Sequence, residues 1–256
     1  MFQIIAYIKF LLKSKNQHGV HSPFVFDLVT NCFYNKKPQD YYFLLKKHRN
    51  LLYQDNRVIH VTDFGSGSRV FSSNRRKVSK IAKIAGVNPK KAKLLARLVR
   101  YLTIETVLEL GTSVGLGTSS LHIPHTTSIT TLEGCPETAK VAQEYFSKLN
   151  FTDITLLVDE FQKSIPKIEN SSFDLIYFDG NHNEKDTLSY FETLVSLATH
   201  ESIFIFDDIH WSKSMETAWK KIKSHSKVSI TIDTFHFGFV FFRKEHKEKE
   251  HFVIRL

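Results

Sequence analysis

The chain has 256 residues, of which 42% are hydrophobic, so it can bury a large core and is not a mostly disordered protein. Two cysteines far apart, Cys32 and Cys135, indicate neither a disulfide framework nor a metal-thiolate cluster, and a reducing, cytoplasmic location is expected. The net charge of +9 comes from residues 69–100, which contain eleven Lys or Arg and no Asp or Glu. This basic segment is expected either to attract an anionic partner such as RNA or to form amphipathic helices with solvated outer faces.

The first hundred residues predict mainly helices. The stretch MFQIIAYIKFLLKSKNQ predicts a short amphipathic helix that packs on the body of the protein or makes a membrane-surface or dimer contact. Ser22 and Pro23 suit the start of a second helix, and Pro89 after Asn88 marks the start of another. The stretch DFGSGSR, residues 63–69, predicts a plain turn or a lid over the mouth of a site.

From residue 105 onward, strands and helices alternate regularly. This rhythm predicts parallel strands joined by right-handed crossovers, with helices on both faces of the sheet. The final pair of strands, around a turn near 233–236, adds one antiparallel member. We therefore expect an α/β, Rossmann-like domain at 104–256, preceded by a helical region at 1–103 that covers its mouth and selects a substrate. The predicted strands are 106–110, 128–133, 153–158, 173–179, 202–208 and two within 227–244.

A glycine-rich turn connects the first of these strands to its helix. VLELGTSVGLGTSS, residues 107–120, places Gly111, Gly115 and Gly117 where the backbone can pass close to a ligand. Their spacing differs from the dinucleotide fingerprint, and the Gly-Lys-Ser/Thr of a P-loop is missing. About twenty residues later the next strand ends in Glu133, whose carboxylate can accept both hydroxyls of a ribose.

The motif E-L-G-T-S-x-G-x-G-T-S, followed by a strand-terminal Glu, resembles the cofactor signature of class I S-adenosylmethionine-dependent methyltransferases. The resemblance covers roughly residues 104–243 and implies a doubly wound, seven-stranded, mostly parallel sheet with an antiparallel last strand. It implies that the glycine turn passes the methionine and ribose and that the loop after the third strand lies beside the adenine. The cofactor-binding residues implied are Glu109, Gly111, Thr112, Ser113, Gly115, Ser119, Glu133, Gly134, Asp159, Glu160, Phe161 and Asp179.

Two similar phrases, FDGNH and FDDIHW, end the fourth and fifth predicted strands. Carboxyl ends of parallel strands meet in one crevice, so Asp179, Asp207 and Asp208 are expected to converge. Three carboxylates suit Mg²⁺ or another hard divalent cation. Alternatively, Asp207 or Asp208 caps the helix that begins near Ser212, and Asp179 faces the sulfonium cofactor.

The arrangement resembles the catechol and caffeoyl-CoA O-methyltransferase-like branch, in which an Asp and an Asp-Asn pair bind a divalent ion. This chain departs from that branch in having Asp-Asp, and in having His182 where a lysine is common. His182, with Asp179, is the candidate base that takes a proton from an acceptor hydroxyl; a surface histidine is the alternative. Trp211 is either a packing residue or a wall of the acceptor pocket, and His210 has no comparable role.

The function expected is O-methylation of a small hydroxylated acceptor, with S-adenosylmethionine as cofactor and possible help from a divalent cation. The basic segment 69–100 leaves open an RNA acceptor, particularly a hydroxylated tRNA base. A third alternative is a module that binds the cofactor without catalysis. No integral membrane insertion is expected, and a homodimer remains open.

Overall fold

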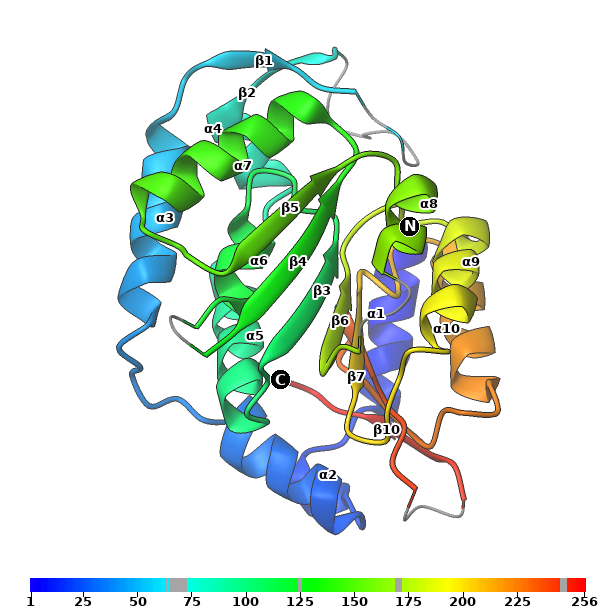
Figure 1. Cartoon of the computed structure of the whole chain (residues 1–256). Coiled ribbons are helices and arrows are strands. Elements are labelled where there is room, and N and C mark those ends of the chain that lie inside the picture. The colour runs from blue at the N-terminus through cyan, green and yellow to red at the C-terminus, as the bar shows by residue number, and fades with distance from the viewer. Residues whose placement is uncertain (63, 65–72, 124–125, 169–171, 245–247) are drawn as a thin grey trace. The chain divides into compact units, whose positions relative to one another are not determined.

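The computed structural model describes residues 1–62, 64, 73–123, 126–168, 172–244 and 248–256 (Figure 1). Apart from Phe64, the predicted turn or lid at 63–69 lies outside these residues. Within them, no helix has both the length and the hydropathy required to cross a membrane. The chain divides into two compact units, Met1–Asn35 with Glu169–Leu256, and Lys36–Ile168. We call them the aspartate unit and the glycine-loop unit; their boundaries do not follow the predicted division after residue 103.

In the glycine-loop unit, three parallel strands lie in the order β5-β4-β3 (Figure 1). They are β3 (Thr106–Leu110), β4 (Ser128–Glu133) and β5 (Ile154–Val158), all predicted from the alternating pattern. A short extended segment is expected from the sequence at 57–61, and β1 (Val58–His60) lies there, paired antiparallel with β2 (Arg75–Lys77). The helices are α3 (Tyr42–Gln54), α4 (Val78–Ile84), α5 (Pro89–Tyr101), α6 (Leu116–Leu121), α7 (Pro136–Lys148) and α8 (Phe161–Ser164), the last followed by a 3-10 turn at Ile165–Ile168.

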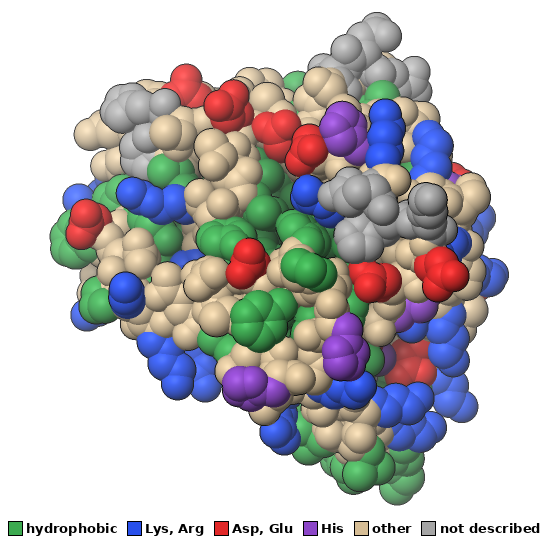
Figure 2. All heavy atoms as spheres, turned by 90° about the horizontal axis from the view of Figure 1, so that it is seen from below, with side chains coloured by type: hydrophobic (Ala, Val, Ile, Leu, Met, Phe, Trp, Pro, Cys, Tyr) green, Lys and Arg blue, Asp and Glu red, His purple; other side chains and the backbone are tan. Residues whose placement is uncertain are grey.

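The described part of the basic segment forms β2, α4 and α5. Asn88 caps α5 by accepting hydrogen bonds from two backbone amides, and the leucines of this helix are buried on one face. Its cations partly cover tyrosines of α3, since Lys93 lies over Tyr42 and Arg100 over Tyr41. On the face drawn in Figure 2, Lys and Arg form several groups with Asp and Glu among them. The described part of the segment therefore has the predicted amphipathic form.

In the aspartate unit, five strands lie in the order β10-β8-β9-β7-β6. The apolar runs of β6 (Leu175–Phe178), β7 (Ile203–Asp207), β8 (Ile230–Asp233) and β9 (Phe237–Phe241) are buried throughout, as expected of strands covered on both faces. β9 is antiparallel to both β7 and β8, which confirms the predicted antiparallel member. β10 (Glu250–Val253) pairs parallel with β8 and is additional to the seven predicted strands.

The helices of the aspartate unit begin where their capping residues predict. Ser22 and Pro23 start α2 (Pro23–Asp27), which continues as a π-helix at Leu28–Phe33. The Ser212 side chain accepts a hydrogen bond from Met215 N and so caps α10, and the alternative of an Asp207 or Asp208 cap is wrong. Figure 1 shows α9 beside α10. The other helices are α1 (Phe2–Lys13), a 3-10 turn at Gln17–Gly19, α9 (Glu184–Leu194) and α10 (Lys213–Ser224).

Candidate functional site

The glycine loop after β3 contains three residues in the left-handed backbone region. They are Gly111 with φ 109°, Ser113 with φ 51° and Gly115 with φ 85°. A side chain at Gly115 would meet the ring of Phe146, because an ideal Cβ there would lie 2.5 Å from it. The loop is held against β4, since Leu132 O accepts hydrogen bonds from Gly111 N at 2.9 Å and from a second loop amide. The glycines thus allow a tight turn whose backbone can approach a ligand.

Glu133 joins this loop to the end of β4. Its Oε2 accepts a hydrogen bond from Ser113 N at 2.7 Å, and its Oε1 accepts one from Cys135 N at 2.8 Å. The side chain is only partly buried. The two backbone amides, one on each carboxylate oxygen, fix the direction of the side chain. The structure therefore presents Glu133 in a fixed orientation beside the loop.

Glu109 and Ser119 lie beneath the loop. The Glu109 Oε2 accepts hydrogen bonds from Thr118 Oγ1 and Thr131 Oγ1, whereas its Oε1 is buried and has no hydrogen-bond partner among the described residues. Burial raises the pKa of Glu109 to about 7, against the opposing effect of the two hydroxyls. The Ser119 hydroxyl donates to Leu116 O within its own helix. Both side chains are buried, so lining of the loop by them remains a prediction.

Asp159 and Glu160 follow β5. Asp159 N donates to Glu133 O at 3.1 Å, which places the start of this segment next to the end of β4. The hydrogen bond from Glu160 N to Asp159, together with Lys163 and Lys167, holds the pKa of Asp159 below its ordinary value. The carboxylates of both residues form ion pairs with these lysines. The predicted proximity of this segment to an adenine therefore depends on its backbone and on Phe161, the first residue of α8.

Gly134 lies between Glu133 and Cys135, under an exposed aromatic ring. An ideal Cβ on Gly134 would lie 2.7 Å from the Phe64 ring, so no larger residue fits without movement of that ring. Phe64 itself is 51% exposed. No local pattern predicts this contact, because the two residues are seventy positions apart.

In the aspartate unit, Asp179 and His182 share the loop after β6. The His182 Nε2 lies 3.8 Å from the Asp179 Oδ1, and both side chains remain partly accessible. The loop is held by Asn181 and Asn183, whose side-chain amides both donate to Asp186 Oδ2. Asn183 also caps α9 by accepting a hydrogen bond from Asp186 N. This network, which was not predicted from the sequence, fixes the backbone on both sides of His182.

Asp207 ends β7 and Asp208 follows it, but their geometry differs from the expected ligand pair. Asp207 is buried; its Oδ1 accepts a hydrogen bond from Asp208 N, and its Oδ2 accepts one from Tyr177 OH at 3.4 Å. Asp208 has φ 52° and directs the chain into a turn that Trp211 N closes on Asp208 O. In the described part of the chain, no three His, Cys, Asp or Glu residues gather as a group that could hold a metal ion. The predicted set of Asp179, Asp207 and Asp208 is therefore not assembled for a cation.

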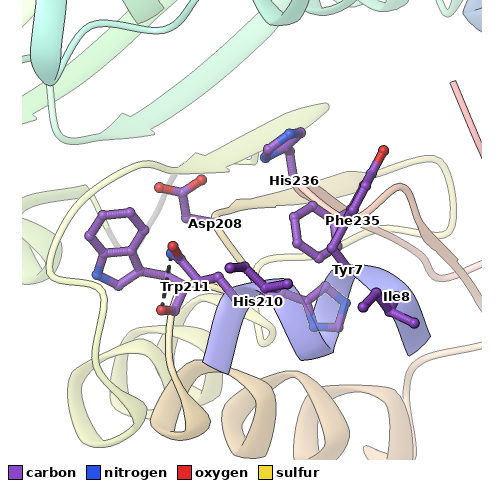
Figure 3. A pocket seen from close by; sticks show the side chains of 9 residues that line it. Tyr7, Ile8, Asp208, His210, Trp211, Phe235 and His236 are labelled. Atoms are coloured by element: carbon purple, nitrogen blue, oxygen red, sulfur yellow. Dashed lines mark hydrogen bonds between the residues drawn. The ribbon is translucent and has the colours of Figure 1, made fainter. Parts of the chain in front are cut away.

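A cavity of about 360 Å³ lies beside Asp208 in the aspartate unit (Figure 3). Aromatic and aliphatic side chains form most of its wall. Figure 3 shows Asp208 and Trp211 on one side and Phe235 and His236 on the other. The Gln3 side chain donates to Trp211 O at 3.3 Å and connects α1 to this wall. The sequence left open whether Trp211 is a packing residue or a wall of the acceptor pocket. In the structure it lines the cavity together with Tyr7, Ile8, Asp208, Phe235 and His236.

His210 supports the wall of this pocket. Its Nδ1 lies 3.0 Å from Glu216 Oε1, its Nε2 lies 2.9 Å from Asp233 Oδ2, and its ring stacks on Phe235. Burial by itself would lower the pKa of His210, but its hydrogen bonds and attraction to Asp233 and Glu216 outweigh burial and raise it. No role for His210 was predicted from the sequence. Its two partners belong to α10 and β8, so only the folded chain reveals the arrangement.

Residues 108–209 match the family model described as a methyltransferase domain. Over these residues the chain is similar to methyltransferase domains. The matched segment begins in β3 and ends just after β7, so it includes the glycine loop, Glu133 and all three aspartates. No curated protein matches the chain closely enough to count as a relative.

Solved structures confirm the predicted Rossmann-like methyltransferase fold and the resemblance to class I and O-methyltransferases. An O-methyltransferase from Bacillus cereus in complex with SAH is 16% identical, with a TM-score of 0.56 over 82% of this chain and 94% of that one. The O-methyltransferase TomG from Streptomyces achromogenes, in complex with SAM, is 15% identical, with a TM-score of 0.57 over 81% and 91%. An SAH-bound methyltransferase from Podospora anserina is 14% identical, with a TM-score of 0.62 over 88% and 97%.

Proposed function

We propose that the protein binds S-adenosylmethionine on its glycine-loop unit and transfers the methyl group to a hydroxyl oxygen of a small acceptor. The observation that carries this proposal is the Glu133 carboxylate, held by the amides of Ser113 and Cys135 beside a loop with three left-handed residues. The methyltransferase domain match and the SAM- and SAH-bound neighbours support it.

The residues present fit this cofactor. The Glu133 carboxylate, at the end of β4 beside the glycine loop, is the group type and position that hold the hydroxyls of a ribose. The buried Glu109 Oε1, which has no partner among the described residues, offers an acceptor next to the loop. When bound, S-adenosylmethionine supplies an electrophilic methyl group. The loop orients it, and the turn at Gly111–Gly115 allows the backbone to lie against it.

His182 is the proposed base. His182 Nε2 would accept the proton of the acceptor's hydroxyl as its oxygen bonds to the methyl carbon, with the methyl–sulfur bond of the bound cofactor breaking to leave a neutral thioether; the acceptor becomes an ether and the imidazole an imidazolium. Asp179, 3.8 Å away, stabilises that positive charge. The Asn181 and Asn183 hydrogen bonds limit the movement of the loop. His182 can therefore be positioned before the acceptor binds.

The pocket beside Asp208 is the proposed acceptor site. Trp211, Tyr7 and Phe235 offer flat apolar surfaces, so a flat or aromatic hydroxylated molecule fits its chemistry better than a sugar. His210 keeps the wall in place through Asp233 and Glu216. The donor set does not fit a divalent cation, because Asp207 is buried and hydrogen-bonded, and no step is assigned to a metal.

The test measures binding and transfer separately. Calorimetry with S-adenosylmethionine should show binding by the wild type, and Glu133→Gln should weaken it about tenfold or more, since hydrogen bonds to a charged group contribute about 1.5–3 kcal/mol. Glu144→Gln, a matched change of an exposed carboxylate on α7, should bind as the wild type does. If the wild type does not bind the cofactor, the proposal is refuted.

Transfer is then followed with labelled S-adenosylmethionine, small-molecule extract and bulk RNA, each with Mg²⁺ and with chelator. His182→Gln should slow transfer to the small molecules while leaving cofactor affinity nearly unchanged. Loss of activity in chelator would support the prediction that a divalent cation takes part. Labelled RNA, with binding that falls steeply with salt, would favour the RNA acceptor. Cofactor binding without any labelled product would favour the non-catalytic module.

A further inference from the structure

The outer face of α1 is apolar and exposed. In the helix Phe2–Lys13, only Ala6 and Phe10 are buried hydrophobic residues. At 100° per residue, the exposed apolar side chains cover a continuous arc of about 160° that contains no charged residue. Leu12 is 83% exposed and Ile4 66%. The arc consists, in order around the helix, of Tyr7, Leu11, Ile4, Ile8, Met1, Leu12 and Ile5; we call it the α1 apolar face.

The helix is fixed with this face outward. Near its start, Gln3 donates to Trp211 O. On its inner side, the Phe10 ring packs on Phe235 with ring centroids 5.5 Å apart. Just after its end, Lys15 N donates to Val253 O, in a short parallel pairing with the end of β10. These contacts hold α1 in place at both ends, so its apolar face stays exposed.

The charged side chains of α1 itself have one sign. Lys9 lies about 40° beyond Ile5 at the border of the arc, and Lys13 lies one turn further along the helix. Both side chains are exposed. The first 26 residues contain three lysines and no Asp or Glu. An apolar face bordered by lysines complements a surface that has an apolar interior and anionic head groups.

A second copy of the chain is a poorer occupant. A helix of twelve residues is about 18 Å long, and a strip of that length and about 10 Å wide offers about 200 Å², far below the ~800 Å² per partner of a stable protein interface. Face-to-face pairing of two such helices would also bring Lys9 and Lys13 of both copies toward one another. A bilayer requires no matching protein surface, and burial of each exposed leucine or isoleucine stabilises attachment.

We propose that α1 docks the protein on an anionic membrane surface, lying in the interface with its apolar face inserted and Lys9 and Lys13 among the head groups. Attachment is peripheral and reversible, because one helix provides a small apolar area and a few charges. The pocket beside Asp208 shares Ile4, Tyr7 and Ile8 with this face, so docking brings the pocket to the membrane. The proposal concerns binding alone and does not depend on methyl transfer.

The test is co-sedimentation of the whole chain with vesicles, without cofactor. The wild type should bind vesicles of equal parts phosphatidylglycerol and phosphatidylcholine at least tenfold more strongly than vesicles of phosphatidylcholine alone. Leu12→Glu should reduce binding to the anionic vesicles at least tenfold. Lys9→Gln should reduce it about fivefold, as expected for one basic residue near such a surface. Phe43→Glu is the matched control, since Phe43 is 68% exposed on α3, and it should bind as the wild type does.

Thermal unfolding of each variant confirms that it is folded, because all three positions are exposed. Sedimentation velocity gives the oligomeric state without lipid. The proposal is overturned if the folded wild type stays in the supernatant when anionic vesicles sediment, or if Leu12→Glu and Phe43→Glu bind equally. It is also overturned if the wild type is a dimer that Leu12→Glu converts to a monomer while vesicle binding is unaffected, because the face would then be an interface between copies.

Discussion

Replacing Glu109 by Gln should change how stability depends on pH. Burial raises the pKa of this carboxyl from 4.5 to about 7 in the folded chain. Below pH 4.5, both the folded and the unfolded chain hold the proton. Between 4.5 and 7, the unfolded chain releases it first, so the free energy of unfolding falls as pH rises. Above 7, both are ionised and the loss is constant. At about 1.4 kcal/mol per pKa unit, it amounts to about 3 kcal/mol.

Glu109→Gln removes the ionisation and keeps an acceptor for the Thr118 and Thr131 hydroxyls. The free energy of unfolding, measured by urea denaturation with circular dichroism, should therefore rise relative to the wild type by about 3 kcal/mol between pH 4.5 and pH 8. Any fixed cost of the amide cancels in that comparison. The control Glu144→Gln, in an exposed ion pair with Arg57, should differ by less than about 1 kcal/mol. Equal Glu109→Gln effects at both pH values would refute the reasoning.

Three further changes test other parts of the chain. His48 is buried, and burial is the main reason that its pKa is lowered to about 3, so the free energy of unfolding falls as the pH drops below 6.5. In urea titrations, the free energy of unfolding of His48→Leu should rise relative to the wild type by up to about 3 kcal/mol between pH 7.5 and pH 4.5. The absence of such a rise would contradict this explanation. Gly115→Ala places a methyl group against Phe146 at a residue with positive φ. It should lower the free energy of unfolding by about 1–3 kcal/mol and weaken cofactor binding in calorimetry. Wild-type values for both quantities would show that the loop tolerates a side chain. Asn183→Ala removes the cap of α9 and should cost about 1 kcal/mol in thermal unfolding, whereas Asn183→Asp should restore most of it, and equal loss in both would point to another cause.

The sequence by itself determined the features that depend on neighbours along the chain. A buried strand, a glycine turn and a helix occupy consecutive residues, so the motif at 107–120 predicted both the local structure and the similarity to methyltransferase domains. Helix starts at Pro23 and Pro89 were equally local. Glu133 could be identified because its place is the end of the next strand, which the apolar alternation marks. The residue pattern along the chain did not predict β10, because this stretch has mixed charges and lacks an apolar alternation. The strand forms through its pairing with β8.

Only the tertiary structure decided which side chains meet. His210 has its partners on α10 and β8, and the pocket takes residues from α1, from the loop after β7 and from the turn before β9. Asp179, Asp207 and Asp208 follow neighbouring strands as predicted, yet their side chains do not gather into a metal-binding group among the described residues. The reason is that strand order fixes where a backbone ends, whereas side-chain direction depends on the local turn. Asp208 adopts a left-handed turn and Asp207 remains buried, and neither follows from the apolar pattern of β7.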